Sequence, residues 1–231
     1  MSGARNTRIF DLSTSTLREL NSTLQQEGAE GAWEIHNPAG RHSLAVGLTQ
    51  PVSITIDGHA GYYAAGMNQR ANVVINGNAG QGVAENMMSG SVHVKGNASS
   101  SAGATAHGGL LVIDGDAGAR CGISMKGVDI VVRGSVGHMS AFMGQSGNLV
   151  VCGDAGEALG DSLYETRIFV RGTVKSLGAD CEEKDMTSED RQILTDLLAK
   201  GGITDIKADE FRRYGSARKL YHFRVDNASA Y

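Results

Sequence analysis

The sequence predicts an all-β fold, a single-stranded right-handed parallel β-helix of about seven coils with short flanking helices. Three observations predict it: a glycine that returns every 19 residues, apolar columns at fixed distances from that glycine, and polar residues between those columns. Glycine is also abundant, with 32 of 231 residues, against an average usage of about 7%. A collagen-like fold is excluded, because proline occurs only 2 times and no Gly-X-Y period is present.

The glycine column sets the period of the repeat. Its members follow one another at intervals of 19 residues: Gly58, Gly77, Gly96, Gly115, Gly134, Gly153 and Gly172. Four residues before, two before and two after each glycine, the side chain is always Ile, Val, Leu or Ala. Alternation with a period of two is typical of a strand with one buried face. A coil of 19 residues leaves no room for a crossover helix, so we expect parallel strands stacked at about 4.8 Å.

Polar residues follow each glycine of the repeat. The position directly after it holds His59, Asn78, Asn97, Asp116, Ser135, Asp154 and Thr173. We interpret this pair as a bend, with the glycine at positive φ. Hexapeptide left-handed β-helices, calcium-binding nonapeptide rolls and leucine-rich repeats have other periods or consensus residues. The right-handed parallel β-helix is the architecture that remains.

A further column, six residues after the glycine, is small and mostly apolar. It reads Ala64, Val83, Ala102, Cys121, Ser140 and Leu159. We expect it to form a second inward wall of a narrow core.

The chain divides into three predicted segments. Residues 1–50 form an N-terminal helix and cap, 51–180 the β-helix, and 181–231 a C-terminal helix and a tail that docks on the β-helix or on a partner. The first helix is expected at 13–26 and the second at 187–200, where Thr187 and Asp190 indicate a capping box. A short apolar strand is expected at 44–48.

Composition argues for a soluble cytoplasmic protein. The N-terminus lacks the apolar core of a signal peptide, and no apolar run reaches the ~20 residues of a membrane helix. The three cysteines are widely spaced, which is typical of a reducing compartment. With a net charge of −4, neither nucleic acid nor a membrane is an expected partner.

No set of residues converges on chemistry. The histidines and cysteines lack metal-binding and iron–sulfur spacings, so we predict no catalytic, cofactor-binding or metal-binding residue. Cys121 is interpreted as a core residue. Cys152 lies in an outward column between Arg133 and Arg171 of the adjacent coils, so it is either a reactive thiol or an ordinary surface residue.

Basic and aromatic residues near both ends are candidates for a partner interface. They are Asn37, Arg41, Arg212, Arg213, Arg218, Lys219, Tyr221 and His222. Tyrosine and arginine are enriched at protein interfaces. Packing along the prism and nucleic-acid binding are the alternatives for the C-terminal group.

The coil motif I-x-G-[ND]-A-G, over residues 52–175, resembles the C-terminal β-helix (GXGXG) domain of the glutamate synthase large subunit. It is also similar to the β-helix subunit of formylmethanofuran dehydrogenase. The flanks RIFDLSTSTLRELN and SARKLYHFRVDNASAY resemble those of the small β-helix subunit of N-methylglutamate synthase, so that this resemblance covers nearly the whole chain.

The resemblance implies a non-catalytic subunit of an amidotransferase complex that makes N-methylglutamate from methylamine and glutamate. It implies two partners, a class II glutaminase-like chain and a synthase chain that carries FMN and an iron–sulfur cluster. This chain would bridge them and help to enclose the path of the amine, without a cofactor of its own. The alternatives are the β-helix subunit of a formylmethanofuran dehydrogenase-type complex and a self-contained polysaccharide-active β-helix protein.

Overall fold

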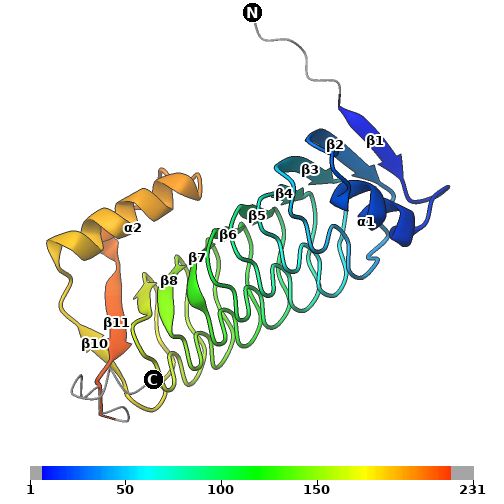
Figure 1. The fold of residues 1–231 in the computed structure, drawn as a ribbon. Coiled ribbons are helices and arrows are strands. Elements are labelled where there is room, and N and C mark those ends of the chain that lie inside the picture. The colour runs from blue at the N-terminus through cyan, green and yellow to red at the C-terminus, as the bar shows by residue number, and fades with distance from the viewer. Residues whose placement is uncertain (1–6, 220–231) are drawn as a thin grey trace, which may run out of the picture.

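The computed structural model describes residues 7–219 and shows a parallel β-solenoid built around one long sheet (Figure 1). The sheet has 11 strands in the order β1-β2-β3-β4-β5-β6-β7-β8-β9-β11-β10. The strands are β1 (Arg8–Asp11), β2 (Gly31–His36), β3 (Val52–Ile56), β4 (Asn72–Ile75), β5 (Ser91–Val94), β6 (Leu110–Ile113), β7 (Lys126–Val132), β8 (Ser146–Val151), β9 (Arg167–Val170), β10 (Cys181–Lys184) and β11 (Arg212–Ser216). The helices are α1 (Leu17–Gln25), α2 (Ser188–Lys200) and the short 3-10 helix η1 (Ala208–Glu210).

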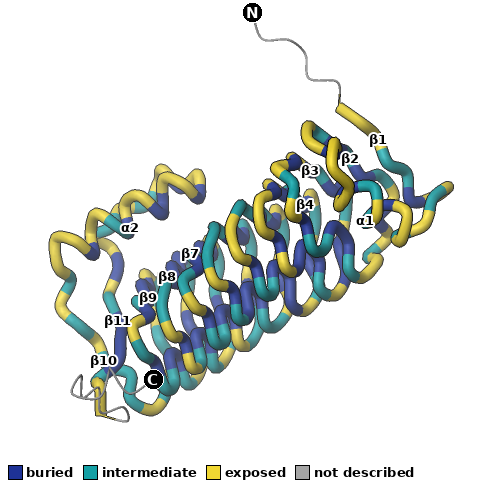
Figure 2. Tube along the Cα trace, in the orientation of Figure 1, coloured by how far each residue is buried: buried dark blue, intermediate teal, exposed yellow. Residues whose placement is uncertain are grey.

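The predicted apolar columns form the core of the prism. Strand pairing places residues 19 apart on top of one another, for example Ile54 beside Val73, and Val92 beside Leu111. Every member of the two columns four and two residues before the glycine is buried, and so are the members of the second wall, including Cys121 and Ser140. Figure 2 shows this buried band running the length of the prism. The prediction of a parallel β-helix with 19-residue coils is therefore confirmed.

Close packing, rather than an unusual φ, accounts for the glycine column. The expected positive φ is found at Gly58, at 138°, but not at the other six glycines, so the predicted bend is wrong there. The backbone N–H of Asp116 donates to Asn97 Oδ1 at 2.8 Å, and equivalent bonds link each coil to the next. A Cβ on Gly115 would overlap with that Asn97 oxygen. The polar residues after each glycine thus form a ladder of hydrogen bonds from coil to coil. Only glycine, without a Cβ, leaves room for it at the repeat position.

The wall opposite the strands has an alternating backbone that the sequence did not predict. In the six coils that begin at Gly58 to Gly153, residues five, seven and nine after the repeat glycine are left-handed, such as Arg120, Gly122 and Ser124 with φ of 57°, 70° and 53°. Residues 44–48 belong to this loop wall, so the expected strand there is wrong. Ala45 and Gly47 have φ of 54° and 64°, which a strand excludes.

Both ends of the core are closed. At the N-terminal end, α1 begins with a Thr16–Glu19 capping box and buries Leu20 and Leu24 in the core cluster. At the C-terminal end, β11 pairs antiparallel with β9 and ends the parallel stack. Because β1 and β2 already pair in parallel with the coils, stacking begins inside residues 1–50. The division into three segments stays a prediction.

The outer face of the sheet carries α2 over its C-terminal half (Figure 1). Leu194, Leu197 and Leu198 of α2 are buried in a second apolar cluster with Val150 and Phe169 of β8 and β9. The predicted capping box is confirmed, since the Thr187 hydroxyl accepts from the Asp190 backbone N–H and the Asp190 side chain caps the Thr187 backbone. Among residues 7–219, no helix is both long and apolar enough to cross a membrane.

Candidate interaction surfaces and a covered cysteine

In the described part of the chain, the interior of the prism is filled by side chains and leaves no chamber for a substrate. The inward residues Ile75, Ile113 and Val132, from successive parts of the stack, are all 0% exposed. Within the part of the chain that the structure describes, no three His, Cys, Asp or Glu side chains gather closely enough to hold a metal ion. The candidate functional residues of the described chain therefore lie on the outside of the prism.

Asn37 and Arg41 fasten the first strand to the turn before the coils. The Asn37 side-chain amide donates to Asp11 Oδ1 at 2.8 Å, and Arg41 Nη2 donates to the Leu12 carbonyl at the same distance. The bond from Asn37, together with bonds from Ser13, lowers the pKa of Asp11 to about 2. Both predicted interface residues are exposed, so a contact with a partner stays a prediction for them.

The basic residues of the C-terminal segment are tied to the last coil. Arg212 Nη2 donates to the Gly172 carbonyl at 3.1 Å. Arg218 Nη2 lies 2.9 Å from both carboxylate oxygens of Glu165. The backbone N–H of Lys219 donates to Asp180 Oδ1 at 2.8 Å. These contacts agree with the alternative that the C-terminal basic residues pack along the prism. A contact of these residues with a partner stays a prediction.

Tyr221 and His222 lie outside the described residues.

Arg213 belongs to a buried charge cluster beneath the N-terminus of α2. The Asp190 carboxylate, whose side chain is 4% exposed, lies 3.3 Å from Arg213 Nε and 3.7 Å from Arg167 Nε. Arg167 also pairs with the exposed Glu189 at 3.0 Å. One buried carboxylate therefore faces two guanidinium groups and fixes α2 to β9 and β11.

Cys152 faces outward, as predicted, but the expectation of an open surface around it is wrong. It is 4% exposed and belongs to the apolar cluster under α2. Burial raises the pKa of the Cys152 thiol to about 11, despite Arg171 and Arg133 nearby. Those two cations are neutralised in turn by Glu210 at 2.9 Å and Asp205 at 3.0 Å. The geometry thus opposes a reactive thiolate at this position.

Among known proteins, Protein GlxC of Rhizobium meliloti (strain 1021) is 60% identical over 226 residues, which are 96% of this chain and 99% of that protein. The chain belongs to the GlxC family. No family profile matches it, and no solved structure does. Because the alignment spans almost the whole chain, the GlxC resemblance includes the flanking segments as well as the coils.

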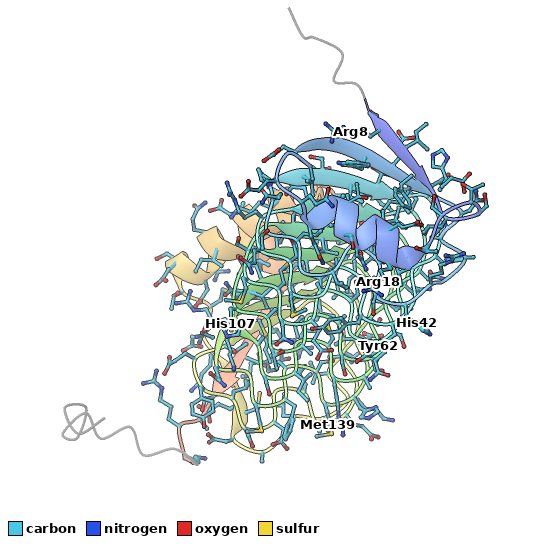
Figure 3. The ribbon with its side chains drawn as sticks, turned by 45° about the vertical axis from the view of Figure 1, so that its right-hand side comes forward. Arg8, Arg18, His42, Tyr62, His107 and Met139 are labelled. Atoms are coloured by element: carbon cyan, nitrogen blue, oxygen red, sulfur yellow. The ribbon has the colours of Figure 1, made fainter. Side chains whose placement is uncertain are left out.

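In this GlxC-family chain, the loop wall carries exposed apolar side chains that sequence reasoning missed. Tyr62, Met67 and Met88 are 47%, 45% and 47% exposed. Tyr62 stacks on Tyr63 at 5.7 Å and meets the His42 ring edge-on at 6.3 Å. Figure 3 shows His42 and Tyr62 side by side on this wall, with Met139 further along the prism. Their columns also hold glutamine, asparagine and serine, so no periodic apolar signal marked them in the sequence.

The docking face of α2 was also missed, although a signal for it was present. The outward column three residues before each glycine reads Thr55, Val74, His93, Val112, Val131, Val150 and Phe169. Its last four members are apolar and buried. A run of apolar residues at outward positions indicates a covering element, because a solvated sheet face alternates with polar residues.

Proposed function

We propose that this chain is a non-catalytic structural subunit of a heteromeric, glutamate synthase-like amidotransferase complex, namely N-methylglutamate synthase. The single observation that carries the proposal is the shape of the described chain, a closed prism with a filled core. Several of its charged side chains hold its C-terminal end and the segment after α2 in place. Membership of the GlxC family and the resemblance of the coils and flanks to the small β-helix subunit support the same assignment.

The proposed partners are a class II glutaminase-like chain and a synthase chain with FMN and an iron–sulfur cluster. The exposed residues Tyr62, Met67 and Met88 give one face on which a partner can bury apolar surface. Methionine and tyrosine are enriched at protein interfaces. The loop wall near the N-terminal end is therefore our candidate for a partner contact.

A path for the amine cannot follow the axis of the prism. Residues that point inward, such as Val94 and Ile130, are 0% exposed and leave no channel. We infer that any path which this chain helps to enclose runs over its outer surface, beneath a partner chain. Excluding water from such a path protects a reactive amine during transfer.

Co-expression with the two partner chains tests the assembly. We expect a single complex on size-exclusion chromatography, and no FMN or iron in the chain purified alone. A double variant, Met67→Glu with Met88→Glu, should weaken assembly, because it places two charges on a surface that is buried in the complex. The control is Thr195→Glu, on the exposed side of α2.

Both variants should keep the thermal unfolding midpoint of the wild type, because all three positions are exposed. Equal assembly by the double variant would contradict the loop wall as a contact. Failure of the wild-type chain to join either partner would contradict the proposed function itself.

A further inference from the structure

A pocket lined by arginines opens at the C-terminal end of the prism, beside β9 and β11. It consists of two adjoining hollows of about 270 Å³ and 430 Å³, which share Glu165, Arg213 and Arg218 in their linings. We call them together the arginine pocket. Arg167 and Asn148 line one hollow, and Lys184 and Gly215 line the other. Pockets of a few hundred Å³ suit small molecules.

The lining of the arginine pocket is cationic. Arg167, Lys184, Arg213 and Arg218 contribute positive charge, and Glu165 is the one carboxylate among the lining residues of the two hollows. The other acidic partners of these cations, Glu182, Glu189 and Asp190, lie outside the lining.

Three of the four acidic residues that pair with these cations are exposed, which leaves the cations available to bind an anion. The side chains of Glu165, Glu182 and Glu189 are 56%, 46% and 70% exposed. Exposed ion pairs are weak in water, so an incoming anion competes for the same cations. Only Asp190 is buried, and it is shared between Arg167 and Arg213.

Two residues that line the pocket each have one buried polar atom without a hydrogen-bond partner within the described chain. The two atoms are Thr166 Oγ1, on a residue that is 2% exposed, and Arg213 Nε. Arg213 Nε lies 3.3 Å from Asp190 Oδ1 but makes no hydrogen bond to it. Buried donors and acceptors are normally satisfied, and an unsatisfied one opposes folding. Thr166 Oγ1 lies beside Gly144, on the inward side of the sheet, so a ligand in the pocket would satisfy the guanidinium group of Arg213 alone.

Gly215 keeps the inner end of the pocket open. A Cβ at this position would meet Lys184 Cγ at 3.7 Å, Arg213 Nη2 at 3.9 Å and the Thr166 carbonyl at 4.0 Å. These are ordinary contact distances, so β11 itself tolerates a side chain here. A larger side chain would occupy the space between the two cations.

We propose that the arginine pocket binds a small organic anion through a carboxylate or phosphate group, with Arg213 and Arg218 as its principal binding residues. A planar guanidinium group donates two parallel hydrogen bonds to such a group. On binding, Arg218 releases the Glu165 carboxylate and contacts the ligand instead. Arg213 keeps its contact with Asp190.

The test is isothermal titration calorimetry of the whole chain at low ionic strength. Inorganic phosphate is one probe and succinate the other. We expect saturable binding of at least one probe, and the stronger of the two identifies the anionic group. Arg218→Gln should weaken binding about tenfold or more, because it removes charged hydrogen bonds. Gly215→Leu should abolish it by filling the pocket.

Arg171→Gln is the matched control, since this exposed arginine pairs with Glu210 outside the pocket and should leave binding unchanged. Arg213→Gln is informative only if it folds, because Arg213 also neutralises buried Asp190, so the Gly215 and Arg218 variants carry the test. No saturable binding of either probe by the wild type would overturn the proposal. Undiminished binding by Gly215→Leu would overturn it too.

Discussion

The outer face of the sheet has two halves that differ although their coils are built alike. Over β3 to β5 its central column holds Thr55, Val74 and His93, which are partly exposed. Over β7 to β9 the same column holds Val131, Val150 and Phe169, which are 0% exposed under α2. We call these the bare half and the covered half. The inward columns define the coil. The residues of the outward column are apolar where another element packs on the sheet and more polar where none does.

Charges on the two halves follow the same division. At the edge of the bare half, His93 and Lys95 pair with Asp114, which follows β6, at 2.8 Å and 3.5 Å. On the covered half, Arg133 and Arg171 pair with acidic residues of the segment that follows α2. Outward charges therefore stabilise neighbouring coils in one region and anchor a crossing segment in the other.

The largest expected effect comes from Phe169. Phe169→Ala should lower the free energy of unfolding by about 3–5 kcal/mol, because it leaves a cavity between β9 and α2. Thr55→Ala, at the equivalent position of the bare half, should change it by less than about 0.5 kcal/mol. Urea unfolding at constant pH measures both. Equal losses would show that the two halves do not differ in packing.

The next effect concerns the reactivity of Cys152. Because burial raises its pKa to about 11, the thiol stays protonated as the pH rises through 8, and the thiolate appears only near the raised pKa. Its thiolate fraction at neutral pH should be about a hundredfold below that of an ordinary thiol. Alkylation followed by mass spectrometry should find Cys152 protected in the wild type. In Phe169→Ala, where α2 is loosened, labelling should accelerate. Rapid labelling of the wild type would contradict the covered half.

The ladder of polar side chains should not distinguish the halves. Gly96→Ala and Gly153→Ala place a Cβ against Asn78 Oδ1 and Ser135 Oγ, one on each half. Each should cost about 1–3 kcal/mol, as overpacking does. Thermal unfolding of the two variants provides the comparison. A loss confined to one half would mean that the ladder is not the common reason for these glycines.

The smallest effect is expected from the surface ion pairs. Arg133→Gln removes the contact with Asp205 and should cost about 0–1 kcal/mol, since both side chains are largely exposed. Lys95→Gln on the bare half should cost no more. Raising the salt concentration should shrink both differences. A loss well above this range for Arg133 would show that the segment after α2 depends on that one anchor.

The coil could be predicted because its information is local and repeated. Inward columns of Ile, Val and Leu, such as Ile113 beside Val132, indicate directly which face of each strand is buried. The loop wall could not be predicted, because Ser124 and Met139 adopt left-handed backbone that their side chains do not favour. The stacking of one coil on the next stabilises that left-handed conformation.

The candidate surfaces were predicted less completely. Arg213 was singled out as a basic residue of the tail, but its buried partner Asp190 stands 23 positions earlier and was visible only as a helix-capping residue. Cys152 was placed on the correct side of the sheet, but its cover comes from α2 and the loop around Ile203. Contacts between distant segments carry these features. The apolar outward column indicates that the sheet is covered, but no spacing in the sequence says which segment covers it.

The most direct test of the structural role is the formation of N-methylglutamate by the glutaminase-like and FMN-dependent chains, with and without this chain. We expect methylamine and glutamate to be converted when the wild-type chain is added. Ile113→Asp buries a charge in the core and should fail to restore conversion. Thr55→Ala on the bare half should restore it fully. Conversion at the full rate by the two catalytic chains alone would contradict the account.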